Sequence, residues 1–127
     1  MSDKPTILVV DDDLPILTLM RSLLREFGFE PVTATSGEEA IAHARATAPA
    51  LVLLDKHMPG MTGGEVIRTL RAEFGGEIPI LILSGDRVSE SELRGLGADG
   101  AVQKPFDVAA LIAKIRAHVM DGGRSSQ

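Results

Sequence analysis

Short apolar runs alternate along this chain with longer stretches in which apolar residues recur at helical spacing. We expect five runs to form strands, at residues 6–10, 30–35, 51–54, 78–83 and 100–103. Each run is followed by a helical stretch, at about residues 14–27, 36–46, 65–74, a short segment after 89, and 107–119. Because strands that alternate with helices form parallel sheets through right-handed crossovers, we predict helices on both faces of one sheet. The pattern therefore indicates a single doubly wound α/β domain with five strands and five helices.

The composition narrows the class of protein. The chain has 127 residues, of which 44% are hydrophobic, enough for one compact domain with a buried core. Its net charge of −5 gives no reason to expect direct binding to nucleic acid. There are no cysteines, so disulfides and thiolate metal sites are excluded. Because we find neither a signal peptide nor a membrane-spanning stretch, we expect a cytoplasmic protein with no membrane partner.

Polar residues directly follow four of the predicted strands: Asp11 and Asp12, then Asp55, Ser84 and Lys104. The carboxyl ends of parallel strands share one edge, and open α/β sheets bind ligands at that edge. A single aspartate there would mean little, since many such residues only cap the next helix. The coincidence of four positions predicts a functional site.

Three carboxylates at one edge would repel one another. At about 4 Å each pair costs roughly 1 kcal/mol in water and about 4 kcal/mol at a partly buried edge. A cation is therefore expected among Asp11, Asp12 and Asp55. Oxygen ligands without cysteine or clustered histidine favour Mg²⁺, with Mn²⁺ as the other option, over zinc or copper. Lys104 supplies a second positive charge.

Four motifs together resemble the signature of response-regulator receiver domains of two-component signalling. They are Val-Val-Asp-Asp at 9–12, Leu-Asp-Lys-His-Met-Pro-Gly at 54–60, Leu-Ser-Gly at 83–85 and Lys-Pro-Phe at 104–106. The resemblance extends over nearly the whole chain, and it implies a receiver domain at 1–121 with a flexible tail at 122–127. The doubly wound fold type by itself indicates the flavodoxin-like strand order 2-1-3-4-5, which places the first strand beside the third.

The resemblance assigns roles to the residues at the sheet edge. Asp55 would be the phosphoacceptor, taking a phosphoryl group from the phosphohistidine of a sensor histidine kinase or phosphotransfer protein. Asp12 and Asp55 would coordinate Mg²⁺ directly, Asp11 would lie close by or act through water, and the His57 backbone carbonyl would be a further ligand. Such a domain catalyses only its own phosphorylation and dephosphorylation, so we do not expect an enzyme acting on other substrates.

The resemblance also implies a switch. Ser84 would supply the hydroxyl that moves toward the phosphoryl group. Lys104 would match the lysine of the family's signature, joined to Pro105 by a cis peptide bond. His57 and Asp86 occupy positions that tune the lifetime of the phosphoryl group. This chain departs from the family at Ala101, three residues before the lysine, where a Tyr or Phe is usual.

Two points about function stay open at the level of sequence. We expect a stand-alone module that docks on an unidentified downstream protein or passes the phosphoryl group onward in a relay. The alternative is a receiver excised from a longer regulator. The alternative class is a metal-dependent aspartyl-phosphate phosphatase that uses Asp11 as nucleophile and Asp13 as acid. A flavodoxin-type cofactor module is set aside, because acids occupy the place of its phosphate loop.

Overall fold

The computed structural model describes residues 4–124, with side chains as far as residue 119. The strands are β1 Thr6–Val10, β2 Glu30–Ala34, β3 Leu51–Asp55, β4 Ile80–Ser84 and β5 Gly100–Gln103. The helices are α1 Leu14–Glu26, α2 Gly37–Thr47, α3 Gly63–Phe74, α4 Glu90–Leu96 and α5 Val108–Arg124. All neighbouring strands are parallel, in the order β2-β1-β3-β4-β5. This confirms the predicted fold class and strand order.

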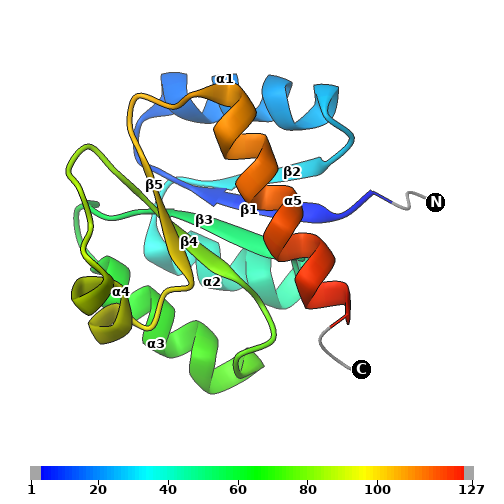
Figure 1. The fold of residues 1–127 in the computed structure, drawn as a ribbon. Coiled ribbons are helices and arrows are strands. Elements are labelled where there is room, and N and C mark those ends of the chain that lie inside the picture. Colours follow the sequence, from blue (N-terminus) through cyan, green and yellow to red (C-terminus); the bar gives the residue numbers. More distant parts are fainter. Residues whose placement is uncertain (1–3, 125–127) are drawn as a thin grey trace.

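Two layers of helices enclose the sheet, as Figure 1 shows, with α1 and α5 on one face and α2, α3 and α4 on the other. Alternate residues of a strand face opposite layers. In β1, for example, Ile7 and Val9 join the cluster under α1 and α5, whereas Leu8 and Val10 join the cluster under α2 and α3. All residues of β3 and β4 are buried, which accounts for their continuous apolar sequence.

Polar caps begin the helices, since the first N–H groups of a helix have no partner within it. Asp13 caps α1 as its sequence position indicates, by accepting from the N–H of Ile16. The helix α3 begins at Gly63, two residues earlier than expected, because Thr62 and Glu65 form a reciprocal capping box. The Thr-x-x-Glu spacing was visible in the sequence and could have located this boundary.

The remaining differences from the expected boundaries lie at the ends of elements. Asp55 and Ser84 are the last residues of β3 and β4 and not the first residues after them. The helix α5 continues to Arg124, three residues beyond the expected end of the domain at 121. The rest of the expected tail, residues 125–127, lies outside the described residues.

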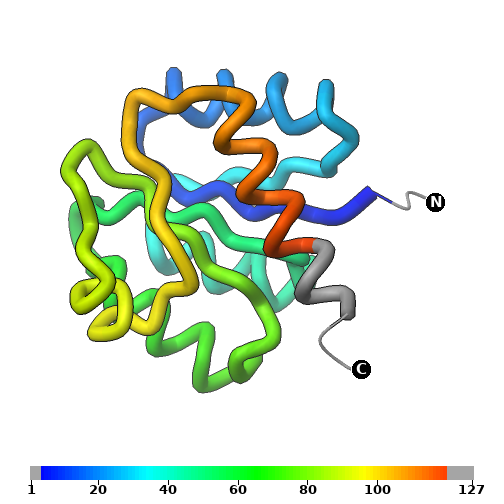
Figure 2. The backbone as a smooth tube through the Cα atoms, viewed as in Figure 1, coloured from blue at the N-terminus to red at the C-terminus, as the bar shows by residue number. Residues whose placement is uncertain are grey.

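The sheet has one edge where the functional residues gather. The loops that leave β1, β3, β4 and β5 lie together on the side away from the amino terminus (Figure 2). No helix within residues 4–124 has the length and apolarity needed to cross a bilayer.

Candidate functional site

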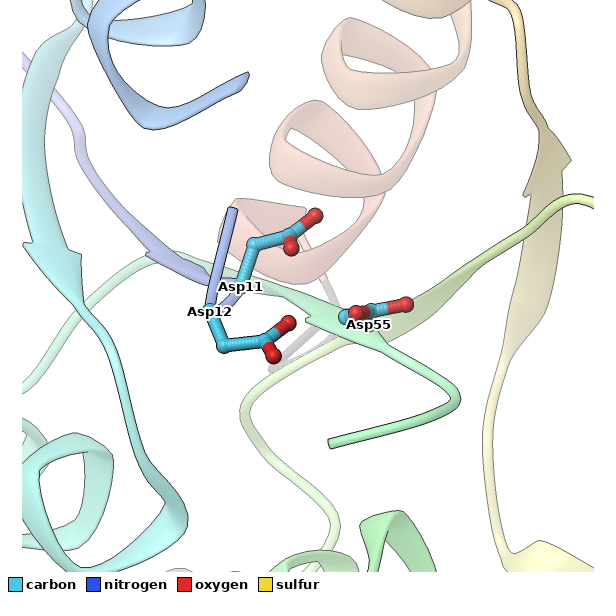
Figure 3. A group of neighbouring side chains, drawn as sticks. All are labelled: Asp11, Asp12 and Asp55. Atoms are coloured by element: carbon cyan, nitrogen blue, oxygen red, sulfur yellow. The ribbon is translucent and has the colours of Figure 1, made fainter. Parts of the chain in front are cut away.

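Three carboxylates meet at the carboxyl ends of β1 and β3. Val10 pairs with Leu54 in the register of these strands, so the acids that follow them are neighbours. Carboxylate oxygens of Asp11, Asp12 and Asp55 all lie within 4.8 Å of one another. Figure 3 shows the three side chains near one another, with the carboxyl group of Asp12 extending toward Asp55. Asp11 and Asp55 are buried, whereas Asp12 is exposed.

Lys104 joins this cluster from β5, two strands away from β3. Its Nζ lies 2.9 Å from Oδ2 of Asp11 and 3.4 Å from Oδ1 of Asp55. The peptide bond between Lys104 and Pro105 is cis, as the resemblance implied. The structure therefore brings together the four charged residues that the sequence placed at this edge.

Ser84 is the last residue of β4, the strand that lies between β3 and β5 in the sheet. The residue is 1% exposed. Its Oγ accepts a hydrogen bond from the N–H of Asp86 at 3.0 Å, and its carbonyl accepts from the N–H of Lys104 at 2.7 Å. Among residues 4–119 the Ser84 hydroxyl donates to no acceptor, so its hydrogen is available to a new one.

Burial and charge perturb the ionisation of this site. Desolvation raises the pKa of Asp55 above its ordinary value, and the neighbouring charge of Asp11 raises it further. Partial burial alone would lower the pKa of Lys104, but its hydrogen bond and attraction to Asp11, with a smaller effect of Asp55, raise that pKa. The lysine is therefore held as a cation, whereas the ionised form of Asp55 is disfavoured.

The residues present fit a hard divalent cation. One ammonium faces three carboxylates, so the cluster keeps an excess of negative charge. Every donor is a carboxylate oxygen, which is the ligand type of Mg²⁺ and Mn²⁺. The exposed carboxylate of Asp12 leaves the cluster open to solvent, as Mg²⁺ requires when it retains several waters.

The rim of the site holds the residues expected to tune it. His57 and Asp86 are both exposed, and the N–H of His57 lies 3.4 Å from Oδ1 of Asp55. Ala101 is half-buried and packs on the cluster under α2 and α3. One further contact, an ion pair between Lys56 and Glu92, was not predicted from the sequence. No spacing rule could have found it, because the two residues meet only in the folded chain.

Comparison with known proteins identifies the family. The family described as response regulator receiver domain matches residues 7–116. The transcriptional regulatory protein PrrA of Mycobacterium leprae is 39% identical over 116 residues, which are 90% of this chain and 49% of that protein. The DNA-binding response regulator MtrA of Mycobacterium tuberculosis is 39% identical over 118 residues, 91% of this chain and 51% of that protein. The chain thus covers about half the length of these curated relatives.

Solved structures agree with the sequence relatives. The chemotaxis protein CheY4 of Vibrio cholerae matches with a TM-score of 0.81 and 31% identity, over 90% of this chain and 98% of that one. The response regulator TrrA of Thermotoga maritima, solved in complex with Mg²⁺ and BeF, matches with a TM-score of 0.81 and 35% identity over the same shares. The fold and the site define a signalling domain of two-component systems. The chain belongs to the response regulator receiver domain family.

Proposed function

We propose that Asp55 accepts a phosphoryl group from the phosphohistidine of a sensor histidine kinase or a phosphotransfer protein. The observation that carries the proposal is the meeting of Asp11, Asp12 and Asp55 with Lys104 at one sheet edge. The family, and a relative solved with Mg²⁺ and BeF, support it. We propose Mg²⁺ as the cofactor, with Asp12 and Asp55 as direct ligands and Asp11 and the His57 backbone carbonyl completing the site.

The proposed transfer forms one bond and breaks one. An oxygen of Asp55 attacks phosphorus, the P–N bond of the phosphohistidine breaks, and the imidazole nitrogen leaves with the electron pair. Lys104 neutralises charge on the transferring oxygens, and Mg²⁺, when held by the carboxylates, would supply further charge neutralisation. The raised pKa of Asp55 shows why a cation matters, since the attacking form is the carboxylate. The product carries about −1.5 to −2 charge, and the Ser84 hydroxyl donates to one of its oxygens.

The alternative nucleophile, Asp11, is less suitable. Its Oδ1 accepts from the N–H of Asp13 at 3.0 Å, and its Oδ2 accepts from Lys104 at 2.9 Å. Both oxygens are therefore engaged, in a residue with no exposed surface. Asp13, the acid that a phosphatase of this kind would need, caps α1 with its side chain. These contacts favour Asp55 as the nucleophile of a receiver domain over Asp11 as the nucleophile of a phosphatase.

We further propose that the domain catalyses only its own phosphorylation and dephosphorylation and acts by docking on another protein in the cytoplasm. The net charge of −5 supports a protein target over direct contact with nucleic acid. The relative MtrA is named as DNA-binding, but this chain covers 51% of it. His57 and Asp86 stand at the rim, where their side chains set how easily water reaches the phosphoryl group and so its lifetime.

Incubation with acetyl phosphate, followed by intact mass measurement, tests the proposal. The mass should rise by one phosphoryl group in the presence of Mg²⁺ and stay unchanged with EDTA. The Asp55→Asn variant should gain no phosphoryl group. The Asp13→Asn variant is the matched control, because asparagine also caps helices well, and it should be phosphorylated normally. Phosphorylation that persists in Asp55→Asn would assign the nucleophile elsewhere, to Asp11 if it disappears in Asp11→Asn.

A further inference from the structure

The ion pair between Lys56 and Glu92 links the proposed phosphorylation site to α4, a helix with no fully buried residue. Lys56 directly follows Asp55, and its Nζ lies 2.5 Å from Oε2 of Glu92. Glu92 belongs to the first turn of α4. The chemistry proposed for Asp55 makes no use of this contact, so its role has to be sought in the coupling of the site to α4.

The alternation of side chains along β3 explains how Lys56 reaches α4. Leu53 joins the cluster under α1 and α5, whereas Leu54 joins the cluster under α2 and α3. The same period of two turns Asp55 toward the first side and Lys56 toward the second, where α4 lies. The N–H of Lys56 also donates to the carbonyl of Leu83 at 2.9 Å, which fixes the residue beside the end of β4.

The two ends of α4 are held by different contacts. The helix has seven residues, buries none of them fully, and contains Gly95, which weakens a helix by its conformational freedom. At its carboxyl end, Arg71 donates to the carbonyl of Gly97 at 3.0 Å. At its amino end, the Lys56–Glu92 pair is the only ion pair that α4 makes within residues 4–119. A displacement of the amino end of α4 would therefore have to break or stretch the Lys56–Glu92 ion pair.

We propose that the Lys56–Glu92 ion pair is a latch that holds α4 in its unphosphorylated position and breaks when the domain is activated. The inference rests on the proposed function, because the trigger is the movement of Ser84 toward a phosphoryl group on Asp55. Ser84 is joined to Ser89, the N-cap of α4, by the four residues 85–88. The movement of Ser84 draws this short loop inward and so displaces the first turn of α4, which separates Glu92 from Lys56.

This route from Ser84 to α4 does not need the aromatic side chain that the family usually has on β5. The residue at the family's aromatic switch position is Ala101, whose side chain has no rotamer that could report the movement of Ser84. The bond from the N–H of Asp86 to Ser84 Oγ, at 3.0 Å, couples the hydroxyl directly to the loop that leads to α4. The loop and the latch therefore provide a route from Ser84 to α4 that needs no aromatic side chain at Ala101.

The affinity for BeF₃⁻ in saturating Mg²⁺ tests the latch, because a contact that activation breaks must oppose ligand binding. We expect Lys56→Met and Glu92→Gln each to bind BeF₃⁻ about two- to five-fold more tightly than the wild type, the range typical of an ion pair that solvent can still reach. The two substitutions change the charge near the site in opposite senses. A shift in the same direction therefore reports the pair and not the local potential.

Further variants sharpen the test. Glu90→Gln removes a charge from the same helical turn, and Glu90 makes no ion pair among residues 4–119, so its affinity should stay within about two-fold of wild type. The charge-swapped double variant, Lys56→Glu with Glu92→Lys, should restore the wild-type affinity. Without BeF₃⁻, amide exchange in α4, at Leu93 and Gly97, should accelerate two- to five-fold in Glu92→Gln.

The possible outcomes distinguish a failure of the latch proposal from a failure of the proposal that Asp55 is the phosphoacceptor. Unchanged affinities in Lys56→Met and Glu92→Gln, or shifts in opposite directions, would refute the latch while BeF₃⁻ binding by the wild type upholds the phosphoacceptor. Failure of the wild type to bind BeF₃⁻ would overturn both. Weaker binding by both variants would mean that the pair belongs to the activated state, which also refutes the latch.

Discussion

Replacing Asp55 by asparagine should stabilise the metal-free protein, although the residue is central to the proposed function. With carboxylate oxygens within 4.8 Å, the repulsion of Asp55 by Asp11 and by Asp12 is about 3.5 kcal/mol each at an effective dielectric constant of 20. The attraction of Lys104 at 3.4 Å offsets about 5 kcal/mol of this. The remainder, about 2 kcal/mol, is an upper value because Asp12 is exposed to solvent screening.

The pKa of Asp55 gives the pH dependence. Burial, with the charge of Asp11, raises this pKa in the folded protein above the ordinary value of 3.8. The folded state therefore binds the proton more tightly than the unfolded state, and its stability falls as pH rises from about 3.8 through the raised value. This destabilisation is absent below the ordinary pKa and complete only above the raised pKa. The gain in free energy of unfolding from Asp55→Asn should therefore appear over the same pH range.

Urea unfolding in EDTA at low ionic strength measures the effect. At pH 7 we expect Asp55→Asn to raise the free energy of unfolding by about 1–2 kcal/mol, with an unchanged m-value. Saturating Mg²⁺ should narrow or reverse the gap, because a ligand at a hundred times its Kd adds about 2.7 kcal/mol to the wild type. The Asp13→Asn control should show no such gain. A metal-free Asp55→Asn protein less stable than wild type at pH 7 would refute the electrostatic account.

Two local contacts give further predictions. Thr62→Ala should lower the free energy of unfolding by about 1 kcal/mol, because the Thr62 hydroxyl accepts the N–H of Glu65 in the cap of α3, and Thr62→Ser should preserve it. Gly37→Ala should cost about 1–3 kcal/mol, since a Cβ there would lie 2.7 Å from Val66 Cγ2. Gly95→Ala is its control: a Cβ there meets nothing within 4 Å, so the free energy of unfolding should rise by about 0.5–1 kcal/mol. Urea midpoints that fail to follow these signs would contradict the packing described.

The alternation of apolar runs and helical stretches was enough to predict the α/β class, because buried parallel strands require apolar residues on both faces. The same pattern predicted that Asp11, Asp55 and Lys104 would share an edge, since strand ends are visible in the sequence. The strand order was less accessible. It was inferred from the doubly wound fold type, because which strands pair depends on crossovers and not on local sequence.

Contacts between distant segments were decided only by the tertiary structure. The distances from Lys104 to Asp11 and Asp55, and hence the pKa shifts, depend on β5 lying at one edge of the sheet and on the rotamers at its end. The pairing of Lys56 with Glu92 has no local signal at all. The sequence by itself determined which groups stand at the rim of the sheet, because strand periodicity is local. Their partners and ionisation required the fold, because charge interactions depend on distances in space and on burial.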